Sequence, residues 1–258
     1  MIEIRNVWKR FDDNIILENI SATVKEGEFV TLVGASGCGK STFLRMLLGT
    51  DSPSQGSILL DGKAIPSEPD SGRGVVFQQY SVFPHLTVLE NVAIARAFER
   101  SKLGFLWGAA KKAAREEAAD LLNIVGLSHM LHRYPDELSG GMRQRLAIAQ
   151  ALILKPRILL LDEPFGALDP GIRADMHELV LNLWRKHKLT VFMVTHDLKE
   201  GFHLGTRLWV FDKLRVDPQA PNAYGAGITY DLPVGACEPE LLEEIDGSLS
   251  ANKQAEQI

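Results

Sequence analysis

Glycine, small hydroxyl residues and lysine, the residue types that bind phosphate, are concentrated in one stretch near the N-terminus. Residues 32–42 read LVGASGCGKST, and the apolar segment 29–33 reads as a short buried strand that runs into this stretch. Residues 43–48, FLRMLL, have the composition of a helix start. The glycines therefore fall at a strand-to-helix turn, where outward-pointing backbone N–H groups form a concave anion site.

The stretch also matches the phosphate-loop pattern G-x-x-x-x-G-K-[ST] between Gly34 and Ser41. Glycine permits positive φ and close approach of a ligand, while Lys40 places a positive charge at the β- and γ-phosphates and Ser41 can ligate Mg²⁺. A flexible glycine turn is the alternative interpretation, and the strand before and the helix after favour nucleotide binding. The predicted nucleotide-binding residues of this loop are Gly34, Ser36, Gly37, Cys38, Gly39, Lys40, Ser41 and Thr42.

Two carboxylates end a second apolar segment. Residues 158–161 read ILLL, as expected of a central parallel strand that is buried on both faces, and Asp162 and Glu163 follow. In open α/β sheets, ligands bind beyond the carboxyl ends of the strands. We predict that Asp162 holds Mg²⁺, mostly through water, and that Glu163 polarises a water for in-line attack on the γ-phosphate. The alternative is that both residues begin a solvated turn.

The remaining pattern alternates strands with helices, which predicts an α/β domain with a parallel sheet. An all-helical stretch over residues 85–138 is predicted to be an insertion into that domain. Its first helix follows a capping box formed by Thr87 and Glu90. The predicted elements are strands at 2–11, 20–24, 29–33, 56–60, 74–77, 158–161 and 190–195, and helices at 43–48, from 87, at 109–125, from 139 to about 154, and after 169.

The overall composition excludes several classes of protein. The net charge is −5, from 28 Lys and Arg against 33 Asp and Glu, so no basic surplus exists to neutralise nucleic-acid phosphates. The two cysteines, Cys38 and Cys237, have no metal-site or disulfide spacing, which favours a reducing compartment. The N-terminus does not resemble a signal peptide, and no apolar run approaches the ~20 residues that cross a bilayer. We therefore expect any membrane role to depend on a partner.

Residues 138–145, LSGGMRQR, resemble the LSGGQ signature of ATP-binding cassette proteins. The phosphate loop, this signature, LLLDEP at 159–164, ALD at 167–169 and His196 follow the order and approximate spacing of that family, and the resemblance covers about residues 1–211. It implies that Gln78 belongs to the family's Q-loop, that Phe11 stacks on adenine, and that His196 senses the γ-phosphate. A lone Phe is more often a core residue, and a His at a strand end can be an ordinary turn residue.

The resemblance implies a P-loop NTPase (RecA-like) parallel-sheet core, with an N-terminal antiparallel β subdomain and an inserted α-helical subdomain. The implied domains are a nucleotide-binding core over 1–84 and 139–215, a helical signature subdomain over 85–138, and a C-terminal extension over 216–258 with a mobile tail from 248. The implied cofactors are ATP and Mg²⁺. The implied catalytic residues are Glu163, His196 and Gln78, and the implied metal ligands are Ser41, Gln78 and Asp162.

In that family two cassettes pair head to tail, and each ATP lies between one chain's phosphate loop and the other's signature. Ser139 is a good N-cap, and Gly140 and Gly141 leave amides bare at a helix N-terminus, which makes a second anion site. Plain capping is the alternative for Ser139, as it is for Asp169, which precedes Pro170. The resemblance adds a role across the dimer for both residues.

The transport function follows from the resemblance as well. DEPFGALD and LSGGMRQR resemble solute importers, nearest to the nitrate, sulfonate and taurine branch, so we expect membrane permease subunits, a solute-binding protein and a place on the cytoplasmic face of the membrane. Phe83 and Leu86 are expected to receive a helix of the permease. The solute stays open, with nitrate, a sulfonate and a urea- or guanidine-like molecule as candidates. A non-transport cassette, an exporter subunit and a weakly hydrolysing nucleotide switch are the alternatives, and Glu163 argues against the last.

Overall fold

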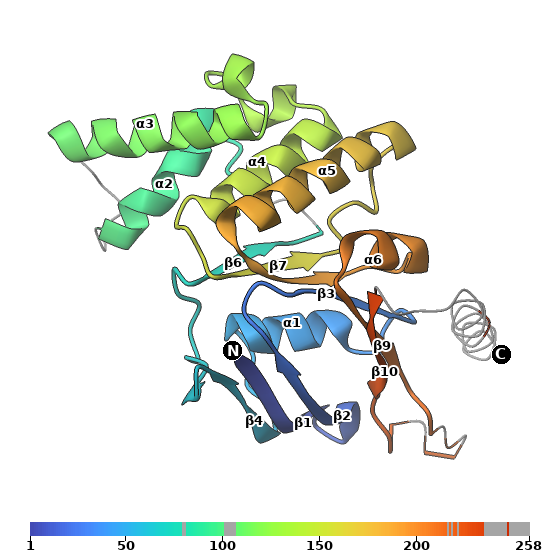
Figure 1. Ribbon diagram of the computed structural model, residues 1–258. Coiled ribbons are helices and arrows are strands. Elements are labelled where there is room, and N and C mark those ends of the chain that lie inside the picture. The colour runs from blue at the N-terminus through green and yellow to red at the C-terminus, as the bar shows by residue number, and fades with distance from the viewer. Residues whose placement is uncertain are drawn as a thin grey trace. The chain divides into compact units, whose positions relative to one another are not determined.

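The computed structural model (Figure 1) describes residues 1–78, 81–100, 107–215, 217, 219–220, 222–234 and 247. The chain divides into two compact units. The first unit comprises Met1–Pro69 and Lys188–Ile258, and the second comprises Asp70–His187. The predicted helical subdomain, 85–138, falls wholly within the second unit, and its boundaries stay a prediction.

An antiparallel sheet of the first unit is built from the N-terminal residues. Its order is β2-β1-β4-β5, so β2 lies at one edge. The Asp61–Gly62 turn between β4 and β5 has φ of 51° and 77°, the left-handed pair that a tight hairpin turn requires. The predicted strand at 20–24 is the end of a longer strand. The strands are β1 (Ile2–Phe11), β2 (Asn14–Val24), β4 (Gln55–Leu60) and β5 (Lys63–Ala64).

A second set of strands in the first unit surrounds β3 (Phe29–Gly34). This strand pairs in parallel with β8 (Thr190–Val194) on one side and β9 (Arg207–Asp212) on the other. β10 (Gly227–Pro233) pairs antiparallel with β9. Every residue of β3 and β8 is buried, which explains why both sequences are apolar apart from the small residues Thr31, Gly34 and Thr190. The unit also includes the helices α1 (Lys40–Leu48), which packs on β3, and α6 (Leu198–Leu204).

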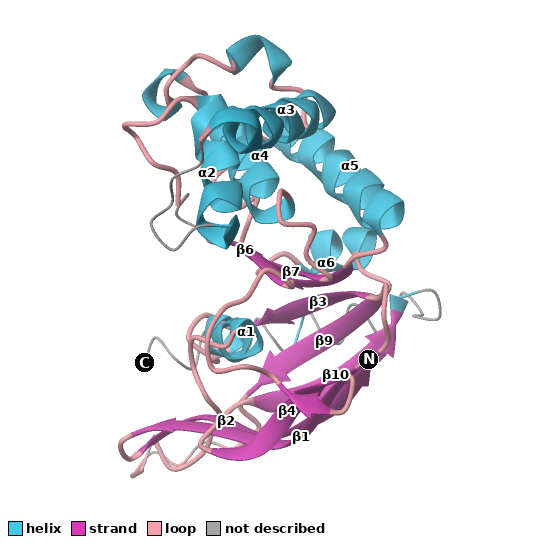
Figure 2. Cartoon of the chain, turned by 90° about the vertical axis from the view of Figure 1, so that its left-hand side faces the viewer, coloured by secondary structure: helices cyan, strands magenta, loops and turns pink. Residues whose placement is uncertain are grey.

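The second unit combines a short parallel strand pair with a group of helices. β6 (Arg73–Val76) pairs in parallel with β7 (Ile158–Asp162). α2 packs against α3 and α4, and α4 packs against α5, as Figure 2 shows. The helices are α2 (Val88–Arg100), α3 (Gly108–Ile124), α4 (Gly140–Leu152) and α5 (Pro170–His187), with 3₁₀ turns at Ser128–Met130 and Pro135–Glu137.

Two predicted helix ends are confirmed, whereas the helix predicted at 43–48 begins earlier, at Lys40, because the left-handed Gly39 is its N-cap. Glu90 N donates to Thr87 Oγ1 at 3.3 Å and Thr87 N donates to Glu90 Oε2 at 3.2 Å, which is the predicted capping box of α2. Gly126, after α3, has φ of 79°, as a left-handed stop requires. Residues 248–258, predicted as a mobile tail, lie outside the described residues.

Candidate nucleotide site

The phosphate loop joins β3 to α1 and depends on its glycines for its shape. Gly37 and Gly39 have φ of 82° and 89°, in the left-handed region that side chains disfavour. Gly34 has φ of 151°, and a Cβ there would lie 2.1 Å from the Phe211 carbonyl oxygen. Three positions of the loop thus tolerate glycine and little else, by conformation and by space.

Lys40 lies within this loop and is only 6% exposed. Its Nζ donates to the carbonyl oxygens of Gly34 and Ala35 at 2.8 and 2.6 Å. The ammonium therefore sits at the centre of the loop, beside the N-terminus of α1, where the helix dipole also favours an anion. Ser36 and Gly37 are exposed at the tip of the loop, so the charge lies beneath an accessible backbone.

Two further residues of the loop differ in their exposure. Ser41 is half-buried and Thr42 is buried in the first turn of α1.

The Cys38 Sγ accepts a hydrogen bond from Lys40 Nζ at 3.5 Å. Burial raises the pKa of the Cys38 thiol above its ordinary value, although the Lys40 charge acts in the opposite direction. The Cys38 thiol is therefore protonated at neutral pH.

The predicted carboxylates follow β7 in the second unit. Asp162 is the last residue of that strand, and both it and Glu163 are half-buried. Glu163 has φ of 45°, a left-handed conformation that a residue other than glycine seldom adopts and that often marks a functional position. Gln78 Nε2 donates to Glu163 Oε2 at 3.2 Å. The structure thus brings together two of the three predicted catalytic residues.

The signature residues begin α4. Ser139 is extended, with φ of −65°, and its Oγ accepts from Met142 N at 3.3 Å, which confirms the predicted N-cap. Gly141 has no room for a side chain, because a Cβ would lie 2.6 Å from Ile172 Cγ2. Gly140 faces open space, since its nearest neighbour would be Leu168 Cδ2 at 3.9 Å.

The remaining predicted residues lie at the ends of strands and helices. Asp169 is exposed and immediately precedes Pro170, the first residue of α5, where proline is well accommodated. His196 is exposed and is the second residue after β8. Phe11 is 46% exposed at the end of β1, with Lys9 Nζ 4.7 Å from its ring centroid. The interpretation of Phe11 as a core residue is therefore wrong.

Sequence analysis missed the residues that fix the backbone around His196. The buried Thr195 hydroxyl is 2.5 Å from the buried Glu200 carboxylate, and Asp197 N donates to Thr195 Oγ1 at 3.1 Å. Asp197 Oδ1 accepts from Glu200 N at 3.1 Å and so caps α6. The signal was present in the sequence, because an Asp followed three residues later by Glu is an N-terminal helix pattern.

Within the described residues, no group of three or more His, Cys, Asp or Glu side chains could hold a metal. The predicted magnesium ligands are instead a hydroxyl, an amide oxygen and a carboxylate, from Ser41, Gln78 and Asp162. These are the hard oxygen donors that Mg²⁺ takes, together with water and phosphate oxygens. The donor chemistry of the predicted residues fits this cation.

Fold and loops together define a phosphate-loop nucleotide-binding protein whose second unit begins a helix, α4, with two glycines. Residues 17–166 match the family described as ABC transporter. The chain therefore belongs to the ABC transporter family, as its ATP-binding cassette, and the predicted family and fold class are confirmed.

Named relatives agree with this assignment. The chain is 44% identical over 214 residues to the spermidine/putrescine import ATP-binding protein PotA of Nitrosomonas eutropha, covering 82% of this chain and 57% of that protein. It is 40% identical over 219 residues to the nitrate import ATP-binding protein NrtD of a Synechocystis strain, covering 85% and 77%. The chain thus spans little more than half of the PotA relative.

A solved structure of a dimeric bacterial ABC transporter cassette, MJ0796, superimposes on this chain with a TM-score of 0.74 at 30% identity, covering 91% of this chain and 99% of that one. The same cassette is known in a dimeric post-hydrolysis state bound to ADP and Pi, with a TM-score of 0.72. The predicted ATP-hydrolysing importer subunit agrees with these proteins. None of the helices in the described part of the chain combines the length and apolar content that a bilayer crossing requires.

Proposed function

We propose that this chain hydrolyses ATP as one of two cassettes that close around two ATP molecules, and that it thereby drives import of a small solute through a separate membrane permease. One observation carries the proposal. Lys40 is buried within a glycine loop and donates to the backbone of that loop. A buried ammonium beneath bare amides is suited to bind a polyphosphate.

The hydrolytic step requires few groups of this chain. The phosphates lie on the loop amides, and Lys40 exchanges its two backbone acceptors for β- and γ-phosphate oxygens. The Glu163 carboxylate accepts a proton from the attacking water, whose oxygen forms a bond to the γ-phosphorus as the bond to the bridging oxygen breaks. Gln78, which donates to that carboxylate, holds it in place. His196 is proposed to contact the γ-phosphate.

Mg²⁺ is proposed to bind beside the phosphates through Ser41, Gln78 and Asp162. The cation supplies positive charge that offsets the charge developing on the phosphate oxygens. Phe11 is proposed to stack on adenine, which its exposure permits.

The signature supports the paired arrangement. The open face of Gly140 leaves the N-terminus of α4 accessible, and Ser139 is exposed beside it. An anion held there benefits from the helix dipole. We propose that the γ-phosphate bound by a second copy, or by a paralogous cassette, occupies this position. Asp169, exposed at the start of α5, contributes to the same interface.

A loop in the second unit is suited to dock the permease. Phe83 is 39% exposed although its backbone is firmly held. Asn91, fully buried, accepts from Phe83 N at 2.7 Å and donates to the carbonyls of Phe83 and Leu86 at 3.0 and 2.9 Å. An exposed aromatic side chain on a rigid backbone is a low-cost anchor for a partner helix.

The names of the relatives, which are import ATP-binding proteins for polyamines and for nitrate, support an importer of a small polar solute. We propose a solute-binding protein and a permease as its partners, at the cytoplasmic face of the membrane. Nitrate and polyamines carry opposite charges, so these names do not select one solute. This is expected because solute contacts belong to other subunits.

Glu163→Gln tests the proposed function. The amide keeps the size of the side chain but cannot accept the proton, so we expect ATP hydrolysis to fall at least about 100-fold while ATP binding persists. The variant should form an ATP-dependent dimer, measured by size-exclusion chromatography with light scattering. Glu178→Gln, on the exposed face of α5, is the matched control and should behave as the wild type. Wild-type hydrolysis by Glu163→Gln, or a strict monomer at full activity, would contradict the proposal.

The import role needs a separate experiment. The tagged wild-type chain should copurify with a polytopic membrane protein encoded beside it, from detergent-solubilised membranes. Phe83→Asp should abolish that copurification and leave ATP binding intact, because burying an unpaired carboxylate against the partner helix costs free energy that the aromatic ring does not. Copurification that survives this substitution would contradict the docking role of Phe83.

A further inference from the structure

The connection between β9 and β10 returns to the outer edge of β2, the edge strand of the antiparallel sheet. Residues 222–226, here named the strap, bind this strand through backbone hydrogen bonds. The bonds are, donor first, Ile15 N to Asn222 O at 3.1 Å, Ala226 N to Ile16 O at 2.9 Å and Glu18 N to Ala226 O at 2.9 Å. The strap thus supplies the pairing partner that an edge strand otherwise lacks.

Side chains reinforce this pairing. The Glu18 carboxylate accepts from Gly225 N at 3.2 Å and forms an ion pair with Arg215. The Arg215 guanidinium lies over the Tyr224 ring, 4.4 Å from its centroid. A Cβ on Gly225 would lie 2.8 Å from Ile15 Cγ2 and 2.9 Å from the Leu17 carbonyl carbon. Glycine at this position therefore lets the two backbones meet.

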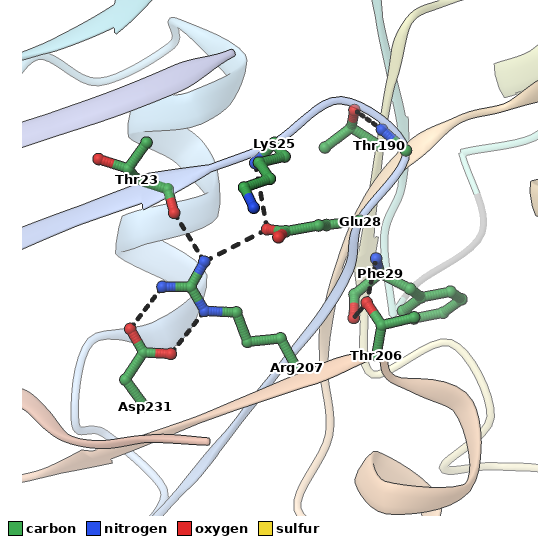
Figure 3. Close-up of polar contacts among 9 residues, drawn as sticks. Thr23, Lys25, Glu28, Phe29, Thr190, Thr206, Arg207 and Asp231 are labelled. Atoms are coloured by element: carbon green, nitrogen blue, oxygen red, sulfur yellow. Dashed lines mark hydrogen bonds and ion pairs between the residues drawn. The ribbon is translucent and has the colours of Figure 1, made fainter. Parts of the chain in front are cut away.

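The far end of β10 is anchored independently, as Figure 3 shows. Arg207 of β9 donates through Nε and Nη2 to the Asp231 carboxylate at 2.5 and 2.6 Å. Its Nη1 donates to the Thr23 carbonyl at 2.6 Å and to Glu28 Oε2 at 3.2 Å. Because β10 is fixed at both ends to β2 or its continuation, the strap is held in a defined position along β2.

The segment of β2 that the strap binds is also the segment that contacts the phosphate loop. The side chains of Leu17 and Ile16 lie 2.6 and 2.9 Å from where a Cβ on Gly39 would stand. Gly39 is the N-cap of α1 and immediately precedes Lys40. At the other end of the segment, Asn14 pairs with Phe11. One short stretch of strand therefore lies between the strap and both the phosphate-binding and the adenine-stacking residues.

We propose that the strap is a positioning element of the nucleotide site: by fixing the 14–18 segment of β2, it sets the place of Gly39 and of the Phe11 hairpin, and so tightens ATP binding. This inference rests on the proposed ATP binding. It assigns a role to the first part of the C-terminal extension. Because a positioning effect acts on bound ATP and on the transition state alike, it predicts a higher KM with kcat unchanged.

Gly225→Val is the first test. The branched side chain must push the strap from β2, so we expect the Kd for ATP, measured by calorimetry on the full-length chain, to rise about threefold to tenfold. The KM should rise by the same factor and kcat should stay within about twofold. Leu214→Ala, 77% exposed in the same connection, is the matched control and should match the wild type in each quantity. An unchanged Kd in a folded Gly225→Val variant overturns the proposal.

Two further measurements keep the test decisive if Gly225→Val fails to fold. Glu18→Ala removes the acceptor of Gly225 N and the partner of Arg215, and should raise the Kd in the same direction by a smaller factor. By reciprocity, ATP should slow hydrogen exchange at the amides of Ile15 and Glu18, which donate to the strap. If ATP leaves the exchange rates of these amides unchanged and Glu18→Ala binds ATP with the wild-type Kd, the inference is refuted. A wild type that binds no ATP would refute the proposed function instead.

Discussion

The phosphate loop and the signature loop, the two proposed anion-binding loops of this chain, use glycine for different reasons. In the phosphate loop, Gly37 and Gly39 supply left-handed conformations, and Gly34 lies so close to the Phe211 carbonyl that no Cβ fits. In the signature loop, neither glycine has a positive φ. Gly141 makes room for Ile172, and Gly140 leaves an open approach to the N-terminus of α4.

The two loops therefore differ in how their polar groups are satisfied within the chain. The phosphate loop encloses its own charge, since the Lys40 ammonium is already bonded to two backbone oxygens. The signature loop has its N-cap satisfied and its surface bare. Damage to the first loop should therefore remove ATP binding, while damage to the second should spare binding and affect only the step that needs the partner cassette.

The largest effect is expected from Gly34→Ala. The new methyl group would meet a backbone carbonyl at 2.1 Å, which neither partner can avoid without moving β3 or β9. We expect a loss of about 3 kcal/mol in the free energy of unfolding and at least about a 100-fold weaker affinity for ATP. Calorimetric titration and urea unfolding measure the two quantities. Gly62→Ala, also at positive φ but with open space around its Cβ, separates conformational strain from collision. Normal ATP affinity in Gly34→Ala would contradict the required close approach.

Gly140→Ala should produce an intermediate effect of another kind. Its methyl group has space within the chain, so folding and ATP binding by the single chain should match the wild type. It obstructs the approach of a phosphate to the α4 amides, so ATPase activity should fall about tenfold to a hundredfold. The ATP-dependent dimer of Glu163→Gln should weaken when Gly140→Ala is added. Full activity in Gly140→Ala would mean that no ligand reaches this helix end.

The position of both loops in the chain could be predicted from sequence, because each loop lies beside a strong local signal. The phosphate loop follows a largely apolar strand, and the signature begins with an N-cap residue. The start of α4 falls where the sequence analysis places it, whereas α1 begins at Lys40, three residues before the predicted start at 43. Pattern and spacing were sufficient for the placement. They could not separate the reasons for the glycines, because Phe211 and Ile172 are distant in sequence from the residues that they approach.

Local sequence patterns also could not predict the residues that hold the Phe83 loop and the 14–18 segment of β2 in place. No local pattern singles out Asn91, whose side chain bonds three backbone groups of the Phe83 loop and accepts a hydrogen bond from Gln150. The strap lies in a segment rich in Pro, Gly and Asn that predicted no regular structure. Its pairing with β2 depends on tertiary contacts between residues about 200 positions apart, such as Glu18 and Gly225 at a separation of 207.

The smallest effect concerns the chemical reactivity of the two loops. Burial raises the pKa of the Cys38 thiol, so its reactive thiolate is scarce at pH 7 to 8, and alkylation by N-ethylmaleimide should accelerate about tenfold per pH unit until the pH passes that raised pKa. Saturating ATP should slow the labelling further. The comparison is a Ser139→Cys variant in which Cys38 and Cys237 are replaced by Ser. Because residue 139 is exposed in the signature loop, its labelling should be fast at pH 8. Mass spectrometry of the labelled chains, with Cys237→Ser throughout, measures both rates. Equal rates at the two positions would show that the phosphate loop opens as freely as the signature, and the contrast between an enclosed and a bare anion site would fail.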